Sequence, residues 1–238
     1  MKTARTIGMA VLTVIVCSLM AACSSDDDEE NGEGSIGKHE YVDLGLPSGT
    51  LWATCNIGAN SPEEYGDYFA WGETEGYNDG KTDFSWSTYK WCNGSPSSIT
   101  KYNSYSNYGS VDEKEDLDLE DDAAYVNWGQ DWRIPSEEQF EELINSSYTA
   151  AEWTIQHGVN GLKITSKTNG NSIFLPAAGN RSTGSLNYAG SYGYYWSRTL
   201  NSEFPDYARV QDFGSSSIYV RSSYRFGGRG VRPVRSSE

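Results

Sequence analysis

Tyrosine, asparagine and arginine residues gather towards the C-terminal end of the chain, where their side chains could bind a ligand. Tyrosine rings stack on sugars or pack against proteins at a low entropic cost, and arginine forms paired hydrogen bonds with carboxylates. We therefore predict a ligand-binding surface in this region. Its candidate residues are Asn187, Tyr188, Tyr192, Tyr194, Arg209, Tyr219, Arg221 and Tyr224. The alternative is that these tyrosines only line the solvent-facing side of a sheet.

The segment 112–122 is dense in Asp and Glu. Carboxylate oxygens are ligands for Ca²⁺, but the segment lacks the Gly and the terminal Glu of an EF-hand loop. We interpret it as the solvated start of a helix, and we predict no metal and no cofactor. Paired carboxylates for glycoside hydrolysis need only be close in space, so a carboxylate-based glycan hydrolase stays a less favoured alternative.

The sequence contains none of the short motifs that mark common catalytic sites. H-E-x-x-H, G-x-S-x-G, C-x-x-C and the phosphate-loop Gly-Lys pattern are all absent. The chain has two histidines, His39 and His157. A Ser-His-Asp or Cys-His site would depend on His157, which stands beside Gly158 and is typical of a turn residue. We predict a protein that is not an enzyme.

The N-terminus has the pattern of a targeting segment. Lys2 and Arg5 precede an apolar stretch over 7–22, which is too short to span a bilayer comfortably and is typical of a secretory signal. The sequence L-M-A-A-C at 19–23 resembles the bacterial lipobox, in which the cysteine is lipidated. We therefore predict a lipoprotein signal peptide over 1–22 and a lipid anchor on Cys23. The alternative is an ordinary signal peptide cut near residue 22.

The predicted tether, 23–37, carries six carboxylates and no basic residue. Such a like-charged run repels itself and stays extended. An acidic run directly after a lipidated cysteine resembles the surface-export signal of Bacteroidota lipoproteins. We therefore expect a protein of the outer membrane that faces the cell exterior and touches the membrane through its lipid anchor only.

Two cysteines, Cys55 and Cys92, belong to the domain predicted over 38–238. Outside the cytoplasm a disulfide between them is possible, and it would close a loop of about 38 residues and contribute roughly 3–4 kcal/mol. The alternative is two separately buried thiols that act as small apolar groups.

The charge of the chain is strongly acidic, with 18 Lys and Arg against 33 Asp and Glu and a net charge of −15. Nucleic-acid binders normally present a basic surface, so we predict no nucleic-acid partner. The C-terminal part differs, because 181–238 holds eight arginines, no lysine and four acidic residues. We expect this positively charged piece to display its rings and guanidinium groups outward.

Turn signals and apolar patterns predict an α+β domain, with two helices packed on a twisted antiparallel sheet and with long loops. Two short strands are expected within 41–56, an aromatic strand over 65–72 and a long irregular segment over 73–109. Helices are expected near 117–128 and after a capping box that starts at Ser136. Further strands are expected at 161–166, 172–178, 194–199, 207–213, 218–221 and 229–234.

Eight segments between Tyr41 and Arg235 carry a family likeness. They are 42–53 (VDLGLPSGTLWA), 66–73 (GDYFAWGE), 121–124 (DDAA), 128–129 (WG), 132–136 (WRIPS), 174–179 (FLPAAG), 195–197 (YWS) and 231–234 (VRPV). In this order they resemble the Fibrobacter succinogenes major paralogous domain of many Bacteroidota lipoproteins. The resemblance covers nearly the whole predicted domain.

This resemblance implies a C-type-lectin-like fold whose late strands and loops form a variable face. It also implies that W-R-I-P-S leads into the second helix and that V-R-P-V closes the domain beside its beginning. The activity of the family is largely unassigned, so the resemblance implies a fold rather than a reaction. The variable proteins of diversity-generating retroelements end in a similar segment, matched here by 194–197 and 225–234.

Together, these patterns favour a non-catalytic cell-surface module that binds a glycan or a protein ligand through its C-terminal surface. One alternative is a structural or adhesin component of the cell surface, which would self-associate. Another is a variable protein diversified by a retroelement. Within the surface, strand alternation places Tyr194 and Trp196 opposite Tyr195, and we expect Trp196 in the core.

Overall fold

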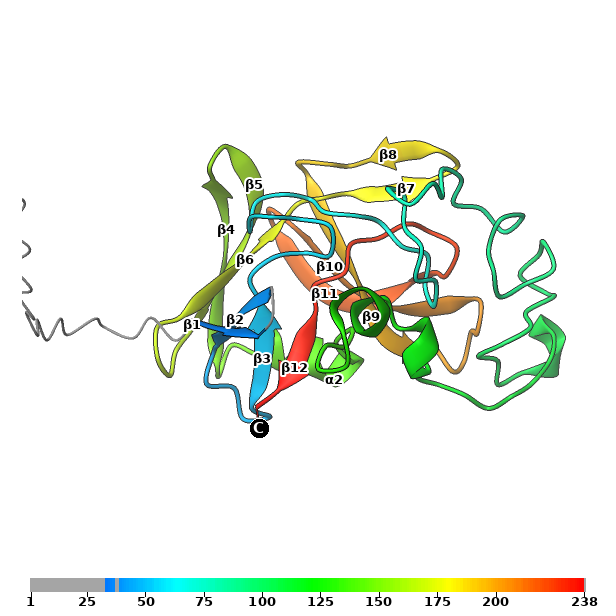
Figure 1. The fold of residues 1–238 in the computed structure, drawn as a ribbon, viewed down its shortest axis with the longest axis horizontal. Helices are drawn as coiled ribbons and strands as arrows, with labels where there is room; N and C mark the ends of the chain where they lie inside the picture. Colours follow the sequence, from blue (N-terminus) through cyan, green and yellow to red (C-terminus); the bar gives the residue numbers. More distant parts are fainter. Residues whose placement is uncertain (1–32, 37–38, 238) are drawn as a thin grey trace, which may run out of the picture. The chain divides into compact units, whose positions relative to one another are not determined.

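The computed structural model describes residues 33–36 and 39–237, and for 33–36 only the backbone is considered. The predicted signal peptide, the lipidation site Cys23 and most of the predicted tether lie outside the described residues. The described part is rich in β-structure and contains two α-helices, which confirms the α+β class (Figure 1). In this part of the chain, no helix is long and apolar enough to cross a membrane.

A four-stranded antiparallel sheet joins the beginning and the end of the domain, in the order β1–β2–β3–β12 (Figure 1). Its strands are β1 (Glu33–Ile36), β2 (His39–Asp43), β3 (Thr50–Ala53) and β12 (Val234–Ser236). β2 and β3 are the two short strands expected within 41–56. Gly49 turns the chain between them with a φ of 70°, a value that favours glycine. Val234 pairs with Trp52, so V-R-P-V does lie beside the start of the domain.

Strand β1 overlaps the tether expected over 23–37. The backbone of β1 pairs antiparallel with β2, with Glu33 opposite Val42. A free edge of β2 would leave N–H and C=O groups unpaired, and the pairing satisfies them. The folded part of the chain therefore begins before residue 38.

Two three-stranded antiparallel sheets make up most of the second half, in place of the one sheet expected. The first contains β4 (Thr149–Gln156), β5 (Val159–Ser166) and β6 (Ser172–Pro176), and the second contains β9 (Tyr192–Leu200), β10 (Tyr207–Gly214) and β11 (Ser217–Tyr224). A separate hairpin, β7 (Asn180–Ser182) and β8 (Ser185–Asn187), lies between them in the sequence. Each sheet consists of strands that follow one another in the sequence. The β7–β8 hairpin lies between β6 and β9 and so separates these strands into two sheets.

The helices begin where a side chain caps them. Helix α1 (Ala123–Trp128) is shorter than the helix expected over 117–128, because the carboxylate of Asp122 accepts hydrogen bonds from the first turn and a separate 3₁₀ turn, η2 (Leu119–Asp121), precedes it. Helix α2 (Glu137–Leu143) has the predicted capping box: the Gln139 amide donates to the Ser136 hydroxyl, and the Ser136 amide donates to the Gln139 side chain.

Two expected strands are wrong. Residues 65–72 and 229–234 meet in one isolated bridge, in which Phe69 and Arg229 exchange backbone hydrogen bonds of 2.9 and 3.0 Å. Gly72 has a φ of 74°, so the first run cannot stay extended. The second run pairs in turn with segments near Phe69, Tyr195 and Arg133, so no continuous ladder forms.

Strand β9 separates two apolar cores. Trp196 is fully buried in one core with Trp71 and Val210, and Tyr195 is fully buried in the other with Phe140 of α2 and Leu162 of β5. The prediction that Trp196 lies in the core is confirmed. Tyr195 is equally buried because α2 and the β4–β6 sheet cover the opposite face of β9.

The segment 73–109 is irregular, as expected, apart from the short 3₁₀ turn η1 (Ser106–Tyr108). Aromatic residues attach it to the rest of the domain. Tyr89 is buried and its hydroxyl donates to the Trp71 carbonyl oxygen at 2.8 Å, and the Trp91 indole donates to the Gly72 carbonyl oxygen at 2.7 Å.

Candidate functional site

The candidate surface is one face of the β9–β10–β11 sheet. In the strand register, Asp212 of β10 lies between Tyr194 of β9 and Tyr219 of β11. Directly opposed residues of antiparallel strands point to the same face, so both tyrosines flank the Asp212 carboxylate. We call the accessible group around it the tyrosine face, which consists of Tyr188, Tyr192, Tyr194, Tyr219 and Arg221.

Three rings of the tyrosine face are in contact. The ring centroids of Tyr188 and Tyr192 are 5.9 Å apart and nearly perpendicular, and those of Tyr192 and Tyr194 are 6.2 Å apart and stacked. The Tyr192 ring lies over Gly214, where a Cβ atom would come within 2.9 Å of it. Tyr188, Tyr192 and Tyr219 are 61%, 40% and 55% exposed, so their rings are open to a ligand.

The Asp212 carboxylate forms the polar floor of this surface. It is buried, its Oδ2 lies 2.9 Å from Nε of Arg221, and its Oδ1 has no hydrogen-bond partner among the described residues. Burial raises the pKa of Asp212, and the positive charges of Arg221 and Arg229 oppose that shift. The surface therefore contains an acceptor and a donor side by side.

Arg229 lies below the rings. Its guanidinium carbon is 5.4 Å from the centre of the Tyr194 ring and 5.2 Å from that of Trp196, and its Nη2 donates to the Ser223 hydroxyl. Burial lowers the pKa of Arg229 to about 10. Burial also raises the pKa of Tyr194, and the nearby Asp212 charge adds to this, so the phenol is neutral at neutral pH. The arrangement offers ring faces, hydroxyls and one ion pair to a ligand.

Three of the predicted ligand-binding residues lie outside the tyrosine face. Arg209 points to the opposite side of the sheet, where its Nε lies 3.2 Å from Oε2 of Glu137 on α2. Tyr224 is at the far end of β11, and its ring stacks on that of Tyr207 with centroids 4.3 Å apart. Asn187 ends strand β8, directly before the tyrosine face begins. The structure thus brings five of the eight candidates together.

The expectation that the C-terminal arginines face outward is wrong for the last part of the chain. Arg225 is fully buried and donates to three backbone carbonyl oxygens and to the Tyr89 hydroxyl. Arg232 is also fully buried and donates to three backbone carbonyl oxygens and to Asn56. Irregular backbone leaves carbonyl groups that need donors inside the domain, and a guanidinium supplies up to five.

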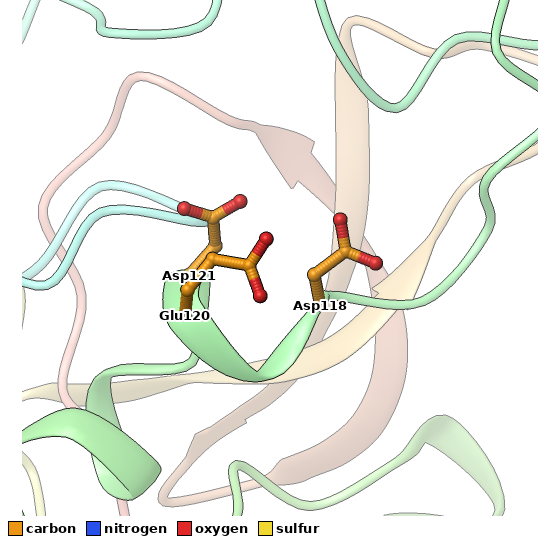
Figure 2. Close-up of side chains that lie close together, drawn as sticks. All are labelled: Asp118, Glu120 and Asp121. Atoms are coloured by element: carbon orange, nitrogen blue, oxygen red, sulfur yellow. The ribbon is translucent and has the colours of Figure 1, made fainter.

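The acidic segment places three carboxylates within 4.8 Å of one another, on Asp118, Glu120 and Asp121 (Figure 2). The ammonium group of Lys101 lies 2.6 Å from both Asp118 and Asp121, and the Tyr102 hydroxyl donates to Asp121 at 2.7 Å. A lysine side chain therefore supplies the positive charge here. The expectation of a merely solvated segment is wrong for Asp121, which is buried in this network.

The structure leaves Cys55 and Cys92 as free, half-buried thiols, so the disulfide considered between them is not formed. Cys92 packs in the irregular segment, where its thiol donates to the Trp86 carbonyl oxygen at 3.1 Å. Cys55 instead follows strand β3 and lines a shallow pocket with His39. The two residues thus belong to different parts of the domain.

His157 is a turn residue, as the sequence predicts. With Gly158 it forms the two-residue connection between β4 and β5, at φ values of 47° and 86°. Its exposed ring lies with Nδ1 2.8 Å from Oε1 of Glu63. The contact with the His157 side chain lowers the pKa of the Glu63 carboxyl.

Sequence reasoning did not select Asp212 and Arg229. Asp212 is one of four acidic residues in 181–238, and a carboxylate in this arginine-rich region is a sequence feature that could have pointed to it. Its position between two tyrosines, however, depends on the register of three strands. Arg229 reaches the same face from an irregular segment that is remote in sequence from β9, and no periodic pattern predicts that approach.

The chain matches no protein-family model, no curated protein and no solved structure in the comparisons made. Its function is therefore inferred from the tyrosine face and from the sequence patterns that precede the domain.

Proposed function

We propose that the protein is a non-catalytic binding module of the cell surface, which recognises a glycan or a protein ligand through the tyrosine face. The lipobox-like sequence before Cys23 and the acidic run after it support a lipid anchor in the outer membrane and an outward-facing domain. The segments similar to the Fibrobacter succinogenes major paralogous domain support a C-type-lectin-like fold.

The contact of the exposed rings of Tyr188 and Tyr192 with each other and with the half-buried ring of Tyr194 is the observation that carries this proposal. Grouped aromatic rings at a protein surface often mark an interaction site, since covering them removes apolar area from water. Tyrosine also keeps a hydroxyl for hydrogen bonding and has few rotatable bonds to order. The Asp212–Arg221 pair adds charged hydrogen-bonding groups to the same patch.

The strands that carry the tyrosine face are held rigidly, which also favours binding. Tyr192 and Tyr194 belong to β9, a strand packed between two cores, and Tyr219 and Arg221 belong to β11, which pairs with β10 along its whole length. A surface held rigid before binding loses little entropy when a ligand arrives.

The test is binding of the full-length chain to an array of glycans and cell-surface proteins, followed by affinity measurement for each ligand found. Tyr188→Ala and Tyr219→Ala are expected to weaken binding about tenfold each, the loss typical of an aromatic contact residue. Tyr105→Ala is the matched control, since Tyr105 is 51% exposed and lies outside the tyrosine face.

Two outcomes would contradict the proposal. If Tyr188→Ala and Tyr219→Ala both bind a confirmed ligand like the unmodified chain, the binding surface lies elsewhere. If the chain binds no ligand of the array and instead self-associates with increasing concentration, a structural role replaces recognition.

A further inference from the structure

A second hollow of the domain lies apart from the tyrosine face. It has a volume of about 540 Å³, within the range of small-molecule sites, and is lined by none of the tyrosine-face residues. Five parts of the chain meet there: residues 117–119 up to the first residue of the η2 turn, the loop 130–133, helix α2, strand β9 and the C-terminal strand β12. Its charged lining residues are Asp131, Arg133, Arg198 and Arg235.

The charge of this lining is unusual for the molecule. The chain carries a net charge of −15, yet the cavity is lined by three arginines and one aspartate. Amides of Gln130 and Gln139 and hydroxyls of the C-terminal serines complete its polar wall. Arg133 and Arg198 both line this space, where their like charges repel each other and an anion between them would be attracted to both.

Arg133 is held in place by contacts with neutral groups. Its Nη1 donates to the carbonyl oxygens of Gln130 and Trp132 at 2.9 and 2.7 Å, and its guanidinium lies 4.4 Å from the centre of the Tyr125 ring. Among the described residues, Arg133 forms no ion pair within 4.0 Å. The group is therefore oriented but keeps donors for a ligand.

Arg198 is oriented in a similar way. Its Nη1 lies 3.3 Å from the Ile134 carbonyl oxygen and 3.2 Å from Oε1 of Gln139, and its Nε is 3.9 Å from the Asp116 carboxylate. At 3.9 Å this last contact is a weak, solvent-screened ion pair. Arg235 also lines the cavity, and its guanidinium carbon lies 5.4 Å from the centre of the Tyr41 ring.

We propose that this cavity binds a small ligand through an oxyanion, a carboxylate or a phosphate, placed between Arg133 and Arg198. Planar guanidinium groups bind such oxyanions with two parallel hydrogen bonds, which makes arginine the preferred residue for them. The polar amides and hydroxyls around the arginines suit a ligand rich in hydroxyls, so the class is an acidic or phosphorylated sugar. This site is independent of the function proposed for the tyrosine face.

The experiment measures binding to the full-length chain by calorimetry, with glucuronate and glucose 6-phosphate as probes and glucose as the neutral control. Binding of at least one anion, weakened by added salt, is expected, and glucose is expected not to bind. The two anions distinguish a carboxylate from a phosphate preference. Arg133→Gln is expected to weaken binding about tenfold, the loss of a charge-assisted hydrogen bond.

Matched variants separate this site from general effects of charge and folding. Asp131→Asn, which removes the one carboxylate of the lining, is expected to strengthen anion binding, a gain that a folding defect cannot produce. Glu203→Gln removes an exposed carboxylate elsewhere and should leave the affinity unchanged. Equal effects of Asp131→Asn and Glu203→Gln, or no binding of either anion at low ionic strength, would overturn the proposal.

Discussion

Tyr195 and Trp196 are neighbours in the chain, yet they are fully buried in two different cores on opposite faces of strand β9. The Trp196 indole donates to the Phe69 carbonyl oxygen at 2.8 Å, and the Tyr195 hydroxyl donates to that of Pro176 at 2.7 Å. Because each polar atom has a hydrogen-bond partner, both large rings can be buried without leaving a polar atom unpaired. The strand that carries the tyrosine face is thus supported from both sides.

Tyr195→Phe is expected to lower the free energy of unfolding by about 1–2 kcal/mol, because the Pro176 carbonyl and the Asn56 amide, 3.2 Å away, each lose a buried partner. Urea denaturation measures the change. Tyr219→Phe, at an exposed position, should leave stability nearly unchanged. Equal losses in the two variants would contradict the role of the Tyr195 hydroxyl.

Arg225→Met is expected to lower the free energy of unfolding by about 3 kcal/mol or more, since three buried backbone carbonyl oxygens lose their donor. Lys163→Met, at an exposed site, should change stability by about 0.5 kcal/mol or less. Thermal and urea unfolding of both variants give the comparison. A stable Arg225→Met protein would show that water or another side chain can take over these carbonyl groups.

Ser136→Ala removes half of the capping box at the start of α2 and is expected to destabilise the domain by about 1 kcal/mol. Ser147 is a suitable control, because it is exposed and lies in the turn after α2. The midpoint of urea unfolding should fall for Ser136→Ala and stay constant for Ser147→Ala. The reverse order would rule out the cap as a source of stability.

The ion pairs of Asp118 predict a pH dependence. The contacts with Lys101, and then with Lys114, lower the pKa of the Asp118 carboxyl below its usual value of 3.8. The unfolded chain therefore takes up the proton more readily, so stability is lost as the pH falls from about 4 through the folded pKa. Asp118→Asn should flatten this part of the stability–pH curve, measured by urea unfolding.

Glu120→Gln is the control for this curve, since Glu120 is exposed and lies 3.7 Å from Lys101. The stability–pH curve of the Glu120→Gln variant should have the same slope below about pH 4 as that of the unmodified protein. A slope that Asp118→Asn leaves unchanged would show that other carboxylates cause the acid sensitivity.

Calcium is expected not to change the melting temperature. The Lys101 ammonium lies 2.6 Å from both Asp118 and Asp121, where a cation would have to sit. Melting curves with calcium and with a chelator should therefore coincide. A clear rise with calcium would mean that Lys101 can leave and that the carboxylates bind the ion instead.

Local chemistry made several elements predictable. The spacing of Ser136 and Gln139 predicts where α2 begins, and the His157–Gly158 pair predicts the turn between β4 and β5. The alternation of β9 predicts that Tyr194 and Trp196 share one face. In each case the decisive interaction joins residues a few positions apart, so the sequence alone contains the whole signal.

The start of α1 and the broken strands were not predictable in this way. Asp122 caps α1 and also accepts a hydrogen bond from the Ile134 amide, a contact that only the folded chain makes. Phe69 and Arg229 form a single bridge because each run turns away after one pair. Aromatic and apolar composition suggests a strand, but it does not indicate how many residues of the segment will pair with the backbone of another segment.

The sequence by itself determined the α+β class, the capped second helix, the hairpin turns and a C-terminal region rich in tyrosine and arginine. Only the tertiary structure decided which of those side chains are available. It placed Tyr188, Tyr192 and Tyr219 at the surface and buried Arg225 and Arg232. The physical reason is that accessibility depends on which distant segments pack on a strand and which of their carbonyl groups need donors.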